Sequence, residues 1–323
     1  MSICHQSFRA ATIGIVWLVA GAVHAQDRTQ AEANCDSLMK SFNAAIAGQA
    51  LLEAQALEGK IATDGVCGAF KDEVLRQRAG LELRLAQALI NRNAPQSDYE
   101  TLIVDAAKPE ILWRASVGVG DMRFERRQFA EAAAAYERAL EIMKSRSKTP
   151  NEPDQGTIKA VFDRASQSRV LAAADETSGG KPVFVSAAKD HRDGTIGGSM
   201  SESIRSFGIS NVPIPIQFET ASAKFTPVGE KAAVELLEAI KDQHPPQVTI
   251  VGHTDERGDA DYNMRLSDQR AKAVAEFLKQ NGVGTQIITV AKGKSEPLQP
   301  SNTEGLTRED IWALNRRVVW KRQ

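Results

Sequence analysis

The stretch VTIVGHTDERGDADYNMRLSDQRAKAVAEFLKQ, residues 248–280, decides the fold of the last third of the chain. It opens with a short apolar run at 248–251, which predicts a buried strand. From 259 to 280 the apolar residues recur three and four apart, and Asn281-Gly282 follows. This spacing predicts a helix that ends at the Asn-Gly pair. A strand therefore leads into an amphipathic helix through the polar loop 252–258.

The flanking residues extend this unit in both directions. Residues 213–218 predict a strand, and Thr226 with Pro227 predicts the start of a helix that stops before Pro245-Pro246. Two more strands are expected at 286–290 and 317–320. The pattern is βαβαβ plus a final strand, which predicts an α/β layer with its helices on one sheet face.

The helix at 259–280 carries two polar residues on its apolar side. Asn263 and Arg270 fall two turns apart within the apolar arc, whereas Lys272 and Glu276 lie outside it. A guanidinium on the covered side is costly unless it is paired, so we expect an acidic partner, and Asp255 is the natural candidate. Two interpretations stay open. Asp255 and Arg270 form an internal salt bridge, or they hold a ligand that has both an ammonium and a carboxylate group.

About 110 residues at the C-terminal end resemble the OmpA-like peptidoglycan-binding domain. The resemblance is carried by Gly252-His253-Thr254-Asp255, Gly258, Tyr262-Asn263, Leu266-Ser267, Arg270-Ala271, Val274 and Asn315-Arg316-Arg317-Val318. It implies a βαβαββ α/β sandwich that binds the meso-diaminopimelate residue of the peptidoglycan stem. It also implies that Asp255 takes the ammonium and Arg270 the carboxylate of that residue.

The same resemblance implies a set of supporting residues. Asn263, Thr254 and Arg316, rather than Arg317, would contact the ligand, and Phe218 and Thr220 match the motif of the first strand. Ala221 stands where some members of the family have a polar contact residue, so a contact there would come from the backbone. Trp312 and Trp320 are expected to pack in the core or at its edge rather than to stack on sugars.

The N-terminus has the pattern of a secretory signal. Arg9 precedes an apolar run at 10–22, and Val23-His24-Ala25 has small residues where a signal peptidase reads. We expect cleavage after Ala25 and a periplasmic protein associated with the cell wall of a Gram-negative envelope. The alternative is an uncleaved membrane anchor, although the run is shorter than the roughly 20 residues that span a bilayer.

Cys35 and Cys67 are the two cysteines that remain after such a cleavage. In an oxidising compartment an even pair favours a disulfide, and two buried free thiols are the alternative. The bridge would close a loop of about 33 residues, worth roughly 3–4 kcal/mol. No metal site and no cofactor are expected, because ligand spacing of Cys and His is absent from the sequence.

Residues 27–176 predict helices. Val119-Gly120, Phe129, Glu131-Ala132, Tyr136 and Ala139-Leu140 resemble one tetratricopeptide repeat, with departures at Arg123 and Arg127, where an aromatic residue and Gly are usual. Gly120 would let two helices approach closely. Flanking helices at 74–93 and 157–175 would complete the stack, either as a surface for an envelope protein or as a bundle without a partner.

The expected organisation is therefore a signal peptide at 1–25, an all-α domain at 26–178, a Gly- and Ser-rich flexible linker at 179–212, and the OmpA-like domain at 213–323, an α+β protein overall. With 40 basic and 41 acidic residues, the chain lacks the basic excess that nucleic-acid binding needs. A recognised nucleophile beside His253 is also lacking, so we expect a binding protein and not an enzyme. The alternatives are an anchoring subunit of an envelope machine, such as a stator or secretion system, and a cell-wall enzyme.

Overall fold

The computed structural model describes residues 12–177, 211–214, 216–300, 303 and 305–322. The chain divides into two compact units, Met1–Leu102 and Ile103–Gln323. The signal peptide and the domain limits predicted from the sequence stay predictions, and nearly all of the expected linker lies outside the described residues. Its last two residues, 211 and 212, belong to a strand.

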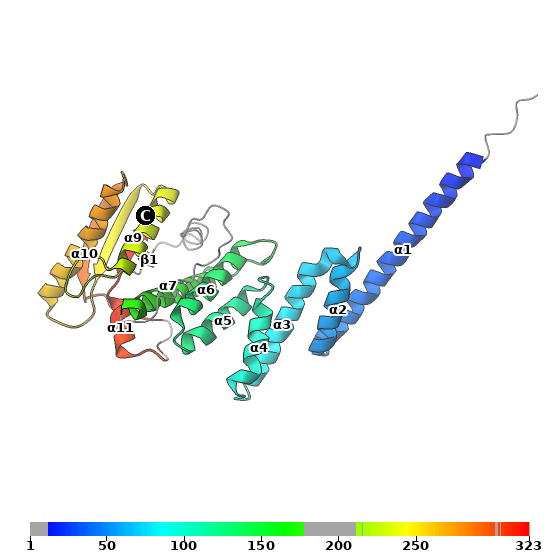
Figure 1. Ribbon diagram of the computed structural model, residues 1–323, viewed down its shortest axis with the longest axis horizontal. Helices are drawn as coiled ribbons and strands as arrows, with labels where there is room; N and C mark the ends of the chain where they lie inside the picture. Colours follow the sequence, from blue (N-terminus) through cyan, green and yellow to red (C-terminus); the bar gives the residue numbers. More distant parts are fainter. Residues whose placement is uncertain (1–11, 178–210, 215, 301–302, 304, 323) are drawn as a thin grey trace, which may run out of the picture. The chain divides into compact units, whose positions relative to one another are not determined.

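The first unit is helical. Its elements are α1 (Thr12–Ala47), α2 (Leu51–Thr63), the short 3-10 helix η1 (Cys67–Phe70) and α3 (Lys71–Ile90), and α4 (Gln96–Ala107) begins in it (Figure 1). Helix α1 starts within the predicted signal segment. Within the described part of the chain, no helix combines the length and the apolar character needed to cross a membrane.

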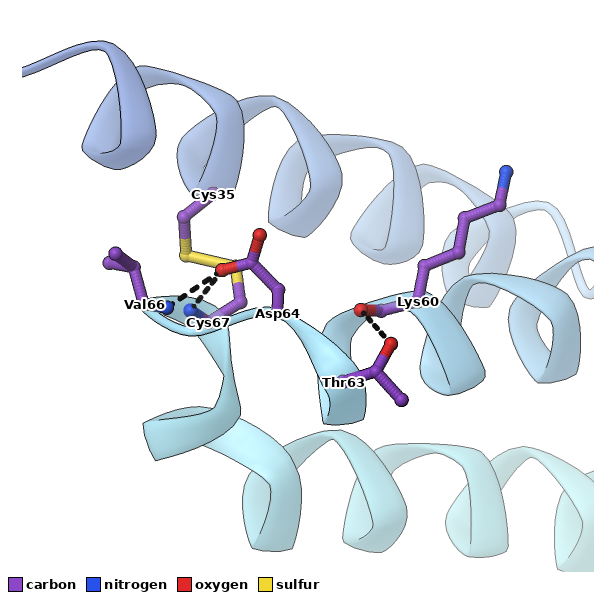
Figure 2. The surroundings of a disulfide bond; sticks show 6 residues. All are labelled: Cys35, Lys60, Thr63, Asp64, Val66 and Cys67. Atoms are coloured by element: carbon purple, nitrogen blue, oxygen red, sulfur yellow. Dashed lines mark hydrogen bonds between the residues drawn. A yellow bond between two sulfur atoms is a disulfide. The ribbon is translucent and has the colours of Figure 1, made fainter. Parts of the chain in front are cut away.

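A disulfide joins α1 to the start of η1. Cys35 and Cys67 are bonded with their Cα atoms 5.2 Å apart, and both side chains are buried beside Phe42 and Ile61. Figure 2 shows how Asp64 stabilises the turn before Cys67. Its Oδ1 accepts hydrogen bonds from the backbone N–H groups of Val66 at 2.8 Å and Cys67 at 2.7 Å. The predicted disulfide is confirmed.

The second unit begins with three packed helices: α5 (Trp113–Glu125), α6 (Phe129–Lys144) and α7 (Gln155–Thr177). Gly120 of α5 lies directly under the ring of Tyr136 in α6, and a Cβ atom at Gly120 would stand 2.5 Å from Tyr136 Cε1. Ala132 and Ala139 are fully buried in the same contact. The expected close approach of the two helices is confirmed, while membership of the tetratricopeptide family stays a prediction.

The turn between α5 and α6 explains one departure from that repeat. Arg127 stands where Gly is usual, and its φ of 59° is the left-handed conformation that Gly adopts without strain. Its guanidinium makes a bidentate pair with Asp310, at 2.6 Å and 3.0 Å. A guanidinium–carboxylate pair with two hydrogen bonds is a strong charge-assisted contact. It offsets the backbone strain of an arginine at positive φ.

The rest of the unit is a four-stranded sheet with helices. Strands β1 (Asn211–Ile214), β2 (Gln247–His253), β3 (Gln286–Gly293) and β4 (Val318–Arg322) lie in the order β1-β4-β2-β3. Strands β2 and β3 are parallel, and β4 is antiparallel to both β1 and β2. The predicted α+β fold is thereby confirmed.

Helices α9 (Pro227–Gln243) and α10 (Ala260–Gln280) pack against each other, and α11 (Arg308–Asn315) precedes β4. Thr226 Oγ1 accepts the N–H of Gly229 at 3.0 Å, so the predicted cap of α9 is confirmed. Val248 and Ile250 of β2, Trp320 of β4 and Val274 of α10 lie in one buried cluster. Trp320 is fully buried, as expected.

The first strand is shorter than predicted. It ends at Ile214, and Phe218 makes an isolated bridge with Phe225 instead of continuing the strand. Pro213 pairs with Val319 in register, and β1 is an edge strand. An edge position tolerates proline because the missing N–H is not needed by a second neighbour.

Removing the disulfide should destabilise the first unit. Cys35→Ser with Cys67→Ser should lower its free energy of unfolding by about 3 kcal/mol, because the unfolded chain regains its loop freedom. Denaturant unfolding of the protein with and without reductant checks this. Titration of two free thiols in the unreduced wild-type protein would contradict the bridge.

Gly120→Ala should lower the free energy of unfolding by about 1–3 kcal/mol, because the new methyl group overlaps the Tyr136 ring. Gly59→Ala is the matched control, since Gly59 is also a helical glycine and its Cβ would meet nothing within 4 Å. That control should be neutral or stabilising by up to about 1 kcal/mol. Equal losses in the two variants would show that the helix contact does not require glycine.

Candidate functional site

A close contact between β2 and α10 sets the position of the candidate site. A Cβ atom at Gly252 would lie 2.2 Å from the backbone oxygen of Ser267, so only glycine fits there. Ser267 Oγ accepts the N–H of Gly293 at 2.9 Å and donates to the oxygen of Met264 at 2.9 Å. The helix is therefore fastened to the ends of both β2 and β3, and the loop 254–259 must turn sharply between strand and helix.

Asp255 lies in this loop and is almost fully buried. Its Oδ1 accepts the backbone N–H and the Nε–H of Arg257, both at 3.1 Å. Its Oδ2 accepts from Arg257 Nη2 at 2.7 Å and from Arg316 Nη1 at 3.0 Å. Burial raises the pKa of Asp255, but the bonds from Arg257 and Arg316 outweigh it and hold the pKa below its ordinary value. The carboxylate is therefore charged at neutral pH.

Arg270 projects from the covered face of α10, as the sequence predicts, and it too is almost fully buried. Its Nε donates to the carbonyl of Ser222 at 3.0 Å, and its Cζ lies 5.0 Å from the centre of the Phe218 ring. Its two terminal nitrogens make no hydrogen bond to any described residue. Burial, and then the positive charge of Arg316, lower the pKa of Arg270 to about 10, so the group still carries its charge at pH 7.

The expected direct pairing of Asp255 with Arg270 is not found among the described residues. The negative charge of Asp255 acts on Arg270 only through space and raises its pKa, whereas the positive charge of Arg316 lowers that pKa. The physical reason is that Arg257 and Arg316 already bond to the Asp255 carboxylate. Beside Arg270, the Ser222 carbonyl and the Phe218 ring take the place of an acid. The structure thus gives no support to an internal Asp255–Arg270 salt bridge.

The other predicted site residues each have their own contacts around Asp255 and Arg270. Asn263 is buried and donates from Nδ2 to the carbonyl of Arg257 at 2.7 Å, which holds the loop against α10. The hydroxyl of Thr254 is buried without a hydrogen-bond partner among the described residues, while its N–H bonds to Gly293. Phe218 packs on Phe225 below Arg270, and Thr220 is exposed in the following turn.

The paired arginines after α11 have separate environments. Arg316 reaches Asp255, whereas Arg317 donates to the carbonyl of Glu296 at 3.1 Å and lies close to Asn315 Oδ1. The preference for Arg316 over Arg317 agrees with this geometry. A role of either residue in ligand binding stays a prediction.

Sequence reasoning missed two groups at the site. Arg257 is the main partner of Asp255, and the Ser222 carbonyl is the main partner of Arg270. The Arg257 contact could have been predicted, because an Asp side chain often bonds to the backbone N–H of the residue two positions later. The Ser222 contact depends on Ala221, whose φ of 53° turns the loop, and nothing in the sequence signals that conformation.

A surface cluster borders Asp255 on the side of α11. Trp312 is half-buried, and the guanidinium carbons of Arg257 and Arg308 lie 4.3 Å and 5.3 Å from its ring centre. Glu256 accepts from Trp312 Nε1 at 3.2 Å and from Arg308 at 3.0 Å. Trp312 is thus a stacking platform at the edge of the core. Within the described residues, acidic, His and Cys side chains form no group of three or more that could hold a metal ion.

Fold and site together define an α/β domain with a buried carboxylate in the loop after β2 and a buried guanidinium on α10, the helix that follows. Residues 217–309 match the OmpA family. The peptidoglycan-associated lipoprotein of Pseudomonas aeruginosa is 32% identical over 152 residues, which cover 47% of this chain and 83% of that protein. The chain belongs to the OmpA family.

Other similar proteins cover smaller parts. The probable lipoprotein YiaD of Escherichia coli is 36% identical over 112 residues, 34% of this chain, and the chain spans about half, 48%, of YiaD. The crystal structure of the peptidoglycan-associated lipoprotein from Burkholderia pseudomallei is 29% identical and covers 36% of this chain and 92% of that one, with a TM-score of 0.29.

His253 gives the domain a predictable response to acid. It is buried at the end of β2, and burial, reinforced by the charge of Arg317, lowers its pKa to about 4. Its unfolded pKa is about 6.5, so as pH falls below that value the unfolded chain takes up the proton first. The free energy of unfolding should therefore fall by about 3 kcal/mol between pH 6.5 and 4, and be unaffected by this group above pH 6.5.

Denaturant unfolding followed by tryptophan fluorescence at pH 7 and pH 4.5 measures this slope. His253→Gln should have a flatter slope than the wild type, and His244→Asn, a change at the exposed histidine that ends α9, should follow the wild type. Identical slopes for wild type and His253→Gln would show that His253 is not buried in its neutral form.

Proposed function

We propose that the C-terminal domain binds peptidoglycan through the meso-diaminopimelate of the stem peptide, and so attaches the helical part of the chain to the cell wall in the periplasm. The observation that carries the proposal is the unpaired fork of Arg270. This buried guanidinium has no carboxylate partner among the described residues, and its terminal nitrogens have no hydrogen bond there. A planar fork of this kind matches a ligand carboxylate in a bidentate pair.

The second half of the proposal concerns Asp255. Its low pKa keeps it charged, and it lies close enough to Arg270 to influence that group's pKa. A ligand that bridges the two must present an ammonium and a carboxylate on the same small head. The side-chain end of meso-diaminopimelate is such a head. The name of the similar Pseudomonas aeruginosa protein, a peptidoglycan-associated lipoprotein, supports this choice of ligand.

The proposed activity is binding without catalysis. The side-chain partners of Asp255 are both arginines, and His253 is buried with a lowered pKa. General acid–base catalysis requires a group that can exchange a proton near neutral pH. Nucleophilic catalysis requires a hydroxyl or thiol in hydrogen-bond contact with a base. Incubation with purified sacculi should therefore release no soluble fragments. Release of muropeptides by the purified protein would contradict this part of the proposal.

Retention on diaminopimelate-type sacculi tests the site directly. Asp255→Asn and Arg270→Ala should each weaken retention by roughly 10- to 100-fold, because each removes a charge-assisted contact to the ligand. Asp255→Asn keeps the shape of the side chain and so limits damage to the loop. The measurement is the fraction of protein that sediments with sacculi over a concentration series.

Two controls accompany this measurement. Asp268→Ala and Lys272→Ala break an exposed ion pair of 2.6 Å on the same helix, and both variants should be retained like the wild type. Sacculi with lysine in place of diaminopimelate offer the ammonium without the carboxylate, so retention of the wild type should fall as well. Equal retention of all variants, or of the wild type on both kinds of sacculi, would refute the proposed site.

A further inference from the structure

Asp255 has no acceptor position left for a ligand. A carboxylate offers about four lone-pair sites on its two oxygens. In this structure Oδ1 takes the backbone N–H and Nε–H of Arg257, and Oδ2 takes Nη2 of Arg257 and Nη1 of Arg316. Protein donors therefore satisfy the whole carboxylate. A ligand ammonium can bind there only when one of these donors leaves.

Arg257 is the donor that can leave most easily. Its side chain is 55% exposed, against 31% for Arg316. Arg316 also begins the connection between α11 and β4, where its backbone N–H bonds to Trp312. Arg257 Cζ already lies 4.3 Å from the ring centre of Trp312, so the guanidinium keeps a cation–π contact when it gives up the carboxylate.

The backbone contacts of Arg257 do not depend on its side chain. Its N–H holds Asp255 Oδ1, and its carbonyl accepts from Asn263. The loop can therefore keep its shape while the guanidinium moves. The arginine end of this ion pair is largely open to solvent, so a bound ammonium can replace it on Asp255.

We propose that the Arg257 guanidinium is a built-in competitor that occupies the ammonium position on Asp255 and is exchanged for the ammonium of the ligand. This inference rests on the proposed function. It makes Arg257 a residue that determines specificity. A ligand with only an ammonium group gains no more than the contact with Asp255 that Arg257 loses. A ligand that also brings a carboxylate to the unfilled fork of Arg270 gains a further pairing and displaces Arg257.

The consequence is an affinity below the intrinsic affinity of the site. When only a fraction of molecules has Asp255 released, the apparent Kd rises by the inverse of that fraction. Removing the competitor should therefore tighten binding. This direction is the opposite of that expected for a residue that contacts the ligand.

Calorimetric titration of the full chain with a soluble stem peptide ending in meso-diaminopimelate tests the exchange. Arg257→Gln, which keeps both backbone contacts, should bind about three- to fivefold more tightly than the wild type. Arg308→Gln is the matched control. Arg308 stacks on the same Trp312 ring and carries the same charge, but it bonds to Glu256 and not to Asp255. It should bind within about twofold of the wild type, the scatter expected from an exposed charge.

The outcomes separate the two proposals. If the wild type binds the peptide and Arg257→Gln binds equally or more weakly, the exchange is wrong and the proposed function stands. If Arg308→Gln tightens as much as Arg257→Gln, general loss of positive charge and not exchange is responsible, and the proposal is again wrong. If neither the wild type nor the variants bind the peptide, the proposed function fails and the exchange with it. Nitrogen-15 spectra give an independent reading, because the Arg257 Nε–H signal should shift on binding while that of Arg317 should not.

Discussion

The contact between Gly252 and the backbone of Ser267 is the constraint on which the site depends. Strand β2 and helix α10 approach so closely there that a single methyl group would overlap the Ser267 carbonyl. The loop between them is short, and Asn263 in the first turn of α10 holds it by donating to the carbonyl of Arg257. The Ser267 hydroxyl adds a bond to β3, and the loop, the helix and two strand ends become one rigid frame. Preorganisation of this kind reduces the entropy lost when a small ligand binds.

Local signals in the sequence were sufficient for much of this frame. Strand β2, helix α10 and the Thr226 cap follow from apolar periodicity and capping chemistry, which act over a few residues. The placement of Arg270 on the covered side of α10 also follows from periodicity. Helix α11 was missed, although Thr307 and Asp310 form a capping box that marks its start. Only eight residues long, it offers too little periodicity to stand out.

The partners of the buried charges were predictable only in part, because they are set by tertiary contacts. The sequence pointed to an acid for Arg270, and the structure instead supplies the Ser222 carbonyl, which follows Ala221 at positive φ, and an aromatic face. Arg316 is 61 residues from Asp255, and its proximity was suggested by family resemblance and not by any local rule. Arg127 illustrates the same limit. Gly is usual at this place in the repeat, which fits the left-handed turn found at Arg127, whereas the pairing with Asp310 has no local signal in the sequence.

The charge balance of the site indicates which part of a ligand drives binding. Asp255 lies among Arg257, Arg270 and Arg316, so three positive groups surround one negative group and leave an excess of two. Burial is the main reason that the pKa of Arg270 is lowered, and the positive charge of Arg316 lowers it further. An incoming carboxylate reduces the repulsion among the arginines, whereas an incoming ammonium adds to it. For the proposed ligand, the carboxylate would therefore supply most of the electrostatic gain, and the ammonium would select among carboxylates by requiring a place on Asp255.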